Sequence, residues 1–458
     1  MARYAGNPET DRAGLIAAAF LAFSLVLGGG GTPAPLPEIA LQVAAALSAV
    51  AAMFWAPATV MRVPTAAWRI AALVLVIPLL QLIPMPPSWW QALPGRGAQV
   101  AALELIGAQD SWRALSLSPS RTLASLLAAA SAMLCLLFAA SLDLRGRQRL
   151  INTLAAIGVV TMLFGAAQLS GGSGSWFRFF DPEEIFLTGF QANHNSTADL
   201  LLMAMLAMAA WARYRIDRAA NPPSLTLMAG AVLIAETVMV LGLVLAGSRA
   251  GIALLPVALV FQYLIVQGTS SINWVKAGLT AVSAAALGTA AFFALRHNRA
   301  IEAIAARFDF SGEFRPELWR DSLFAMGQYW PVGSGQGTFV PVIIAVERLE
   351  VVDPSLPNRA HNDYLELLIG AGLPGAVVLT AVIALTSHAG WRAHRQQSAI
   401  PRTHVLFALG TLLILGLHSL VDYPLRSMAL AAVAATAVGL LLPARHIEAK
   451  DTTEGSHP

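Results

Sequence analysis

The chain has 458 residues, of which 57% are hydrophobic and only 12% are charged. A soluble protein of this size carries about a quarter charged residues, so the composition excludes an ordinary water-soluble fold and indicates an integral membrane protein. The formal net charge is +3, and the one cysteine, Cys135, lies in an apolar run. Disulfides and a cysteine metal cluster are therefore excluded, and neither a cofactor nor a nucleic acid is expected as a ligand.

Apolar segments long enough to cross a bilayer recur along the whole chain. A spanning helix needs about 20 apolar residues and must satisfy its own backbone hydrogen bonds. We therefore predict an all-α, polytopic protein in which residues 1–458 form a single membrane domain. The first apolar run lacks a convincing cleavage site and is interpreted as a retained span. About twelve segments qualify as spans: 13–32, 36–56, 67–84, 121–141, 149–169, 196–213, 224–246, 249–267, 275–295, 372–390, 404–421 and 426–443.

Basic residues set the predicted orientation, because short loops rich in Lys and Arg stay in the cytoplasm. With the N-terminus inside, three longer segments face outward: 85–120, 170–195 and 296–371. We expect the last to be a large helical periplasmic loop that carries part of a site, and 446–458 to be a cytoplasmic tail. The basic residues that then lie inside are Arg62, Arg69, Arg145, Arg147, Arg149, Arg213, Arg215, Arg218, Lys276, Arg392, Arg395, Arg402, Arg445 and Lys450.

Within the large outer segment, the stretch "RPELWRDSLFAMGQYW" has helical periodicity. Trp319, Leu323, Met326 and Trp330 recur at helical spacing, and Pro316 suits a first-turn position. This pattern predicts an amphipathic helix that lies on the membrane with tryptophan at the interface.

The densest polar cluster is in "PNRAHNDYLELLIGAGLPGAV", at the outer boundary of an apolar segment. His361 is a candidate general base, because an imidazole titrates near neutral pH, and Arg359 and Asn362 are supporting candidates. The alternative is helix initiation, in which Asp363 and Glu366 form a capping pair that His361 merely precedes.

Three arginines are candidates for binding phosphate oxygens, which a planar guanidinium grips in a bidentate manner. Arg249 follows Ser248 in a tight outward turn, although a boundary arginine can also simply reach the lipid headgroups. Arg315 and Arg320 lie on the predicted amphipathic helix, where a solvated helix face is the alternative.

Two further outer turns contain polar residues. Asn193 and Asn195 open a span in "GFQANHNSTADLLL", where asparagine can also act as a helix cap. In "GLHSLVDYPLRSMALA", Asp422 is a supporting candidate, and an ion pair with Arg426 that locks a short loop is the simpler interpretation.

Some motifs are absent from the sequence. There is no phosphate-binding loop of a nucleotide-driven pump, no H-E-x-x-H, and no D-x-D pair in the outer segments. We therefore expect no metal to be required.

Taken in order, these motifs resemble the O-antigen ligase and Wzy-type polymerase superfamily, from about Gly189 to Leu441. The resemblance rests on Asn-x-Asn, Ser-Arg-x-Gly, R-x-x-x-W, the glycine-rich "WPVGSGQGTF" and "HNDYLE". It implies a bacterial inner-membrane glycosyltransferase of the polytopic C type, which passes a glycan from undecaprenyl diphosphate to a periplasmic acceptor. The family's diphosphate-binding arginines fall on Arg249 and Arg315, and its acceptor-activating histidine on His361. Pro316, directly after Arg315, departs from the pattern and keeps Arg320 as an alternative.

We therefore expect an inverting, metal-independent transfer to a saccharide or lipid A–core acceptor, with membrane lipid around the donor and a chain-length regulator as a possible partner protein. Polymerase and ligase remain open, with the polymerase slightly favoured. A multi-pass transporter or flippase of a small solute or lipid-linked glycan is the alternative from another class, since about twelve spans suit it equally well.

Overall fold

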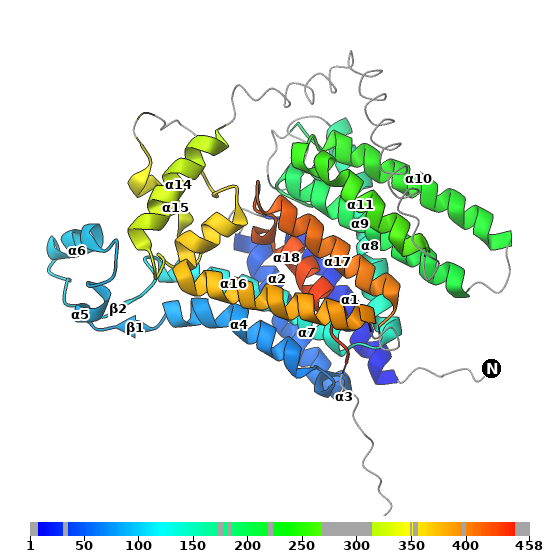
Figure 1. Ribbon diagram of the computed structural model, residues 1–458, viewed down its shortest axis with the longest axis horizontal. Coiled ribbons are helices and arrows are strands. Elements are labelled where there is room, and N and C mark those ends of the chain that lie inside the picture. Colours follow the sequence, from blue (N-terminus) through cyan, green and yellow to red (C-terminus); the bar gives the residue numbers. More distant parts are fainter. Residues whose placement is uncertain are drawn as a thin grey trace, which may run out of the picture.

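The protein is a helical bundle with several short helices gathered at one end (Figure 1). The computed structural model describes residues 8–30, 35–171, 177–178, 180, 185–218, 223–267, 314–348, 350, 356–395 and 400–444. Within these ranges the strands are two residues each, and β1 (Pro84–Met85) pairs with β2 (Arg113–Ala114) in antiparallel fashion. The all-α fold is therefore confirmed.

Eight of the described helices are long and apolar enough to cross a membrane. Three shorter apolar helices coincide with further predicted spans, whereas the predicted span 275–295 lies outside the described residues. A polytopic membrane protein is thus confirmed, and the count of twelve stays a prediction. The eight are α1 (Pro8–Leu27), α2 (Pro35–Trp55), α7 (Pro119–Ser141), α8 (Leu144–Ser170), α9 (His194–Arg218), α10 (Pro223–Leu245), α11 (Arg249–Gln267) and α16 (Asp363–Arg395); the shorter three are α4 (Thr65–Gln81), α17 (Arg402–His418) and α18 (Met428–Leu440).

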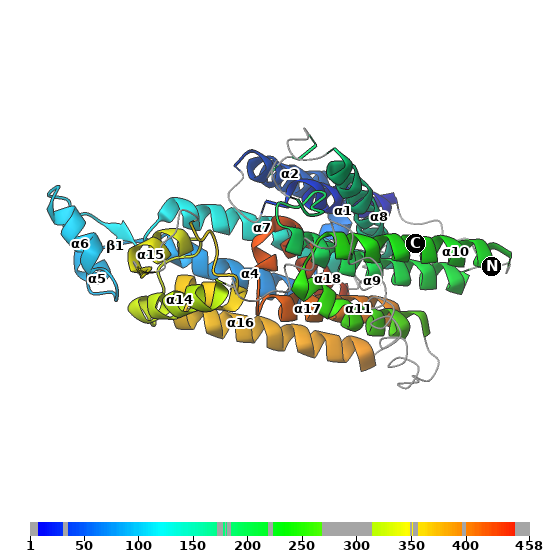
Figure 2. The same ribbon diagram turned by 90° about the horizontal axis from the view of Figure 1, so that it is seen from above.

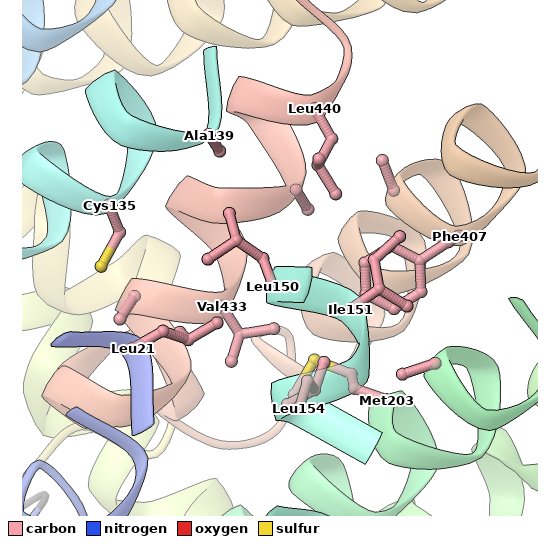
Figure 3. Close-up of a cluster of buried hydrophobic side chains, with 14 of the residues drawn as sticks. Leu21, Cys135, Ala139, Leu150, Ile151, Leu154, Met203, Phe407, Val433 and Leu440 are labelled. Atoms are coloured by element: carbon pink, nitrogen blue, oxygen red, sulfur yellow. The ribbon is translucent and has the colours of Figure 1, made fainter. Parts of the chain in front are cut away.

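Helix α9 lies at the centre of the bundle, with 89% of its apolar window buried. It packs against α8, α10, α11 and α17. Small residues allow this close approach: a Cβ atom on Gly158 of α8 would come within 2.1 Å of the Ala204 Cβ of α9. Beside it, Leu21, Leu150 and Phe407 from α1, α8 and α17 converge on α18 (Figure 3). The centre of the bundle is therefore filled by aliphatic side chains.

Arg147 in α8 has a structural role that its basic character alone does not reveal. Its guanidinium is buried and donates hydrogen bonds to four backbone carbonyls, those of Ala140, Leu142, Leu440 and Leu442, at 2.6–3.0 Å. These carbonyls terminate α7 and α18, where the helices leave acceptors without internal partners. Arg147 thus joins three helices at the end of the bundle opposite the outer segments.

The segment between α4 and α7 projects beyond the bundle (Figures 1 and 2). After the short α3 (Pro57–Met61) and α4, the chain forms β1, α5 (Pro87–Trp90), α6 (Gly97–Glu104) and β2. At the same end lie α14 (Arg315–Tyr329) and α15 (Phe339–Val346). Gln81 connects the segments, because its amide donates to the carbonyl of Gly370 at 2.8 Å and accepts from the backbone N–H of Gln336 at 2.8 Å.

Helix α14 forms as predicted, but it does not pack through the predicted apolar set. Leu318, Ala325 and Tyr329 are its buried apolar residues and share a second small core with α15 and the start of α16. Of the predicted set, Trp319 and Met326 pack partly against this core, whereas Leu323 and Trp330 are 54% and 42% exposed. The buried face also contains the polar residues Asp321 and Ser322, so the pattern of apolar residues alone does not identify it.

Helix α16 is broken at Gly372, the residue at which the sequence predicts a span to begin. Gly372 has φ of +56°, and a Cβ atom there would lie 2.1 Å from the carbonyl oxygen of Pro331. Only glycine tolerates both the left-handed backbone and this close approach. The break separates a short outer piece, which begins at Asp363, from the long apolar piece that follows.

Candidate active site

His361 occupies a strained position immediately before α16. Its backbone φ is +48°, in the left-handed region that non-glycine residues seldom adopt. The next residue, Asn362, caps the helix: its side-chain oxygen accepts from the backbone N–H of Leu365 at 2.9 Å, and its amide donates to the carbonyl of Leu420 at 2.9 Å. Such strain persists only where the surroundings determine it, and it often accompanies function.

The imidazole of His361 is held by Asp422, 61 residues further along the chain. Nδ1 of His361 lies 3.1 Å from Oδ1 of Asp422. The second carboxylate oxygen of Asp422 accepts from the side-chain amide of Asn195 at 2.5 Å. Asp422 is almost fully buried, while the His361 side chain is 16% exposed. With Nδ1 directed to a carboxylate, Nε2 is the ring nitrogen that can exchange a proton.

Two aromatic rings fix the plane of the imidazole. Phe314 and Tyr423 each meet it edge-on, with ring centroids 5.3 and 4.9 Å away. Burial and the charge of Asp422 raise the pKa of Tyr423 to about 12, so its hydroxyl stays protonated at neutral pH. His361 is therefore the better base of the two.

Asp422 is ionised in this setting. Burial alone raises the pKa of a carboxyl group, but the hydrogen bond to His361 and the positive charges of His361, His418 and Arg315 outweigh it and hold the pKa of Asp422 below its ordinary value. A carboxylate at Nδ1 orients the ring and stabilises the imidazolium that forms when Nε2 takes up a proton.

A buried cluster of charges connects the loop that carries His361 to the loop that carries Asp422. Glu366 accepts from Nη1 of Arg359 at 3.0 Å and from the backbone N–H of Ala360 at 3.2 Å. Nε of Arg426 lies 3.4 Å from both Asp363 and Glu366. The expected pairing of Asp422 with Arg426 is therefore wrong, and so is the capping pair of Asp363 with Glu366. Both acids instead bind arginines, and Asp422 is left to contact His361.

Arg315 and Arg320, both on α14, differ in what they face. Arg315 begins the helix and is close enough to Asp422 for its charge to lower the pKa of that carboxyl. Arg320 is exposed, and its charge acts on Glu317 instead. Trp319 secures the helix against the His361 loop, because its indole N–H donates to the carbonyl of Ala360 at 2.9 Å. The geometry thus favours Arg315 as the arginine beside His361.

Arg249 begins α11 at the same end of the bundle. The buried Ser248 side chain caps this helix, accepting from the backbone N–H of Gly251 at 3.1 Å. Gly251 packs directly on α9, because a Cβ atom there would lie 2.6 Å from the Cβ of Ala198. Ala198 is one turn from Asn195, which contacts Asp422. The start of α11 therefore lies against the N-terminal part of α9, and Arg249, its first residue, is half-buried.

Asn193 and Asn195 have separate roles at the start of α9. The side-chain oxygen of Asn193 accepts from the backbone N–H of Asn195 at 2.8 Å, so Asn193 acts as the helix cap that the sequence suggested as an alternative. Asn195 reaches across to Asp422. The predicted site residues Asn195, His361 and Asp422 are thus brought together from three distant parts of the chain.

A second histidine–aspartate pair lies deeper in the bundle and was not predicted. Nδ1 of His418 lies 2.6 Å from Oδ1 of Asp199, and both side chains are buried. The sequence gives one indication of this pair, which is spacing by about one helical turn from the outer residues. Asp199 follows Asn195 by four residues, and His418 precedes Asp422 by four. Asp199 in α9 and Glu236 in α10 also show that acidic residues occur within the spans as well as at their outer ends.

Residues 234–380 match the family model of O-antigen ligases. The match covers about a third of the chain and shows that this part is similar to an O-antigen ligase domain. The match confirms the superfamily resemblance, and the ligase domain includes Arg249, Arg315 and His361 but ends before Asp422. Together with the apolar helices, the match indicates a multi-pass membrane protein that is similar to the ligases and polymerases of this superfamily. No curated protein matches the chain.

Proposed function

We propose that the protein is an inverting glycosyltransferase that moves a glycan from undecaprenyl diphosphate to a saccharide or lipid A–core acceptor. It would act as a polysaccharide polymerase or an O-antigen ligase, at the periplasmic face of the bacterial inner membrane. The observation that carries the proposal is the His361–Asp422 hydrogen bond of 3.1 Å beside Arg315, within and next to an O-antigen ligase domain.

The chemistry assigned to His361 is general-base catalysis. Nε2 takes the proton of an acceptor hydroxyl as the hydroxyl oxygen attacks the anomeric carbon from the face opposite the diphosphate. The new glycosidic bond forms as the bond from that carbon to the diphosphate oxygen breaks, and undecaprenyl diphosphate leaves with the electron pair. Asp422 stabilises the imidazolium that results. A positioned base contributes roughly 10²–10⁴-fold to the rate.

The chemistry assigned to Arg249 and Arg315 is stabilisation of the leaving group. A diphosphate departs as an anion and needs no general acid, so fixed guanidinium groups suit it. Among the described residues, no three His, Cys, Asp or Glu side chains are grouped in a way that could hold a metal ion. The proposal gives the neutralisation of the leaving group's charge to Arg249 and Arg315. Arg359, bound to Glu366, supports the loop, and Arg320 is not assigned to the diphosphate.

The two ends of the helices support the proposed orientation. Helices α9 and α16 begin next to Asn195 and Asp363, beside the proposed site, and end in the basic residues Arg215, Arg218 and Arg395. By the positive-inside rule, these basic ends support a cytoplasmic position for them and an outward-facing position for the site. We accordingly assign 296–371 to the periplasm and 446–458 to the cytoplasm, within one membrane domain. Between the two activities we favour the polymerase, with a chain-length regulator as its partner.

Reconstitution tests the proposal. The purified protein is placed in liposomes with the undecaprenyl-diphosphate-linked glycan isolated from a strain that lacks the gene, and products are separated on gels. New glycosidic bonds with the release of undecaprenyl diphosphate are expected. Accumulation of single lipid-linked repeats in the deletion strain identifies the polymerase, and accumulation of long lipid-linked chains identifies the ligase. Uptake of a solute into the vesicles without any new bond would support a transporter and contradict the proposal.

A further inference from the structure

Phe314 occupies the N-cap of α14, a position that favours small polar side chains. Serine, threonine, aspartate and asparagine are preferred there, because their side-chain oxygens accept from free backbone N–H groups. Phe314 has no such oxygen, and only its backbone carbonyl serves the helix, accepting from the N–H of Leu318 at 3.1 Å. Initiation of the helix therefore does not account for a phenylalanine at this position.

Packing does not account for Phe314 either. Among the described residues, the small core that α14 shares with α15 and α16 does not include it, and neither do the partly buried residues around that core. The Phe314 side chain is instead 53% exposed, although its ring lies beside the imidazole of His361. About half of a large apolar ring is thus free to meet a ligand next to the proposed base.

The two aromatic rings beside His361 differ in how much of their surface is free. Tyr423 is only 6% exposed, so the packing of the protein covers its ring. On the imidazole itself, Nδ1 is occupied by the carboxylate of Asp422 at 3.1 Å. A molecule that approaches the exposed part of His361 therefore meets Phe314 rather than Tyr423.

The distances at this position suit a sugar ring. A hydroxyl that loses its proton to Nε2 lies about 3 Å from that nitrogen, so the centre of the pyranose ring that carries it lies about 5–6 Å away. The centroid of Phe314 is 5.3 Å from that of the imidazole. The sugar and the phenyl ring can therefore contact each other while the hydroxyl stays at Nε2. The C–H groups on one face of a pyranose carry a small positive charge, which suits the negative face of an aromatic ring.

We propose that Phe314 stacks against the acceptor sugar whose hydroxyl His361 deprotonates, and so helps to select a saccharide as the acceptor. This inference rests on the proposed function, and it adds the group that this side of the site binds, the C–H face of a pyranose ring. Arg315, the next residue in the chain, is assigned to the diphosphate. The two neighbouring residues then serve the acceptor and the donor separately.

The test measures binding at His361 without turnover. The probe is the soluble oligosaccharide repeat that mild acid releases from the undecaprenyl-diphosphate-linked glycan of the deletion strain, and it carries neither lipid nor diphosphate. Diethyl pyrocarbonate modifies neutral imidazole, and a sugar bound at His361 blocks its access. The oligosaccharide concentration that halves the modification of His361, followed by mass spectrometry of its peptide, therefore measures binding at this position.

Three variants separate the aromatic ring from other effects. Phe314→Leu keeps an apolar side chain but removes the aromatic face, and Phe314→Tyr restores that face. The matched control is Phe324→Leu, because Phe324 is also exposed, at 58%, but lies ten residues further along the helix, about 15 Å along its axis. The half-protection concentration should rise about tenfold in Phe314→Leu and stay within about twofold of the native value in the other two. Binding of tritiated undecaprenyl diphosphate should be unchanged in all three.

Several results would overturn the inference. One is a half-protection concentration in Phe314→Leu equal to that of the native protein, and another is an equal rise in Phe324→Leu. A third is a native His361 that the oligosaccharide does not protect. If Phe314→Leu changes only the rate of modification without oligosaccharide, the ring merely orients the imidazole. If Phe314→Leu weakens binding of undecaprenyl diphosphate instead, the ring contacts the lipid and not the acceptor. Failure of the proposed function is observed separately, as the absence of transfer by the native protein.

Discussion

Replacement of Asp422 by asparagine changes charge with little change in shape. Asn195 donates to one carboxylate oxygen at 2.5 Å, so the new amide is expected to keep its oxygen on that side. Its NH₂ group then faces Nδ1 of His361, 3.1 Å away in the native protein. Nδ1 becomes an acceptor and the ring proton moves to Nε2, the nitrogen that must take up the acceptor's proton. Asp422→Asn therefore removes the stabilising charge and reverses the tautomer together.

The size of the effect follows from the separation of the two groups. Two unit charges about 3–4 Å apart at an effective dielectric constant of about 20 interact by about 4–5 kcal/mol, and each 1.36 kcal/mol is tenfold in rate. We therefore expect kcat to fall roughly 10³-fold, with binding of undecaprenyl diphosphate within about twofold of the native protein. Initial rates of transfer in liposomes and the binding of tritiated undecaprenyl diphosphate measure the two quantities.

Asp321→Asn is the matched control, because Asp321 is also a buried aspartate of the outer segments but pairs with Arg348 at 2.6 Å. It is expected to lower thermal stability while kcat stays within about threefold of the native value. A loss of less than tenfold in Asp422→Asn, or an equal loss in the control, would refute the assignment of Asp422.

Three further predictions concern other parts of the molecule. Gly372→Ala should lower stability by about 2 kcal/mol or more, because φ is +56° and a backbone oxygen lies 2.1 Å from the new Cβ. Gly327→Ala, in helix α14 with open space around the new Cβ, should instead raise Tm slightly, because alanine favours a helix. Equal Tm values for the two variants would contradict this reasoning. Arg315→Lys should weaken binding of undecaprenyl diphosphate about tenfold through loss of the bidentate contact. Arg320→Lys should weaken it by less than twofold. A larger loss of binding in Arg320→Lys than in Arg315→Lys would identify Arg320 as the residue that binds the diphosphate. Arg147→Lys should lower Tm by several degrees, because the guanidinium donates to four backbone carbonyls and an ammonium group has only three donors. An unchanged Tm would show that those carbonyls do not need these hydrogen bonds.

The apolar pattern was sufficient to predict the membrane fold and a span that begins at residue 372, whereas the break of α16 at Gly372 came from the structure. A run of about 20 apolar residues has few alternatives to a spanning helix. The packing face of α14 was not predictable in the same way. The buried face of α14 includes Asp321, which accepts a hydrogen bond from Arg348. In a hydrophobicity pattern, a charged residue such as Asp321 indicates an exposed face instead.

The pairing of charged residues was the part that sequence reasoning missed. Asp422 and Arg426 are four residues apart, and the local ion pair was the natural expectation. The fold instead brings Arg426 to Asp363 and Glu366, and Asp422 to His361. Partners 60 or more residues apart depend on how the helices pack, which local spacing does not encode. The motifs indicated His361, but the carboxylate that orients it had to come from the structure.

The most direct test of the account is transfer by His361→Gln in liposomes, measured beside the binding of undecaprenyl diphosphate to the same preparation. The account predicts that glycan transfer falls at least about 10²-fold, the contribution of a positioned base, while the lipid binds as tightly as it does to the native protein. Transfer near the native rate in a variant that still binds the lipid would contradict the assignment of His361 as the group that activates the acceptor.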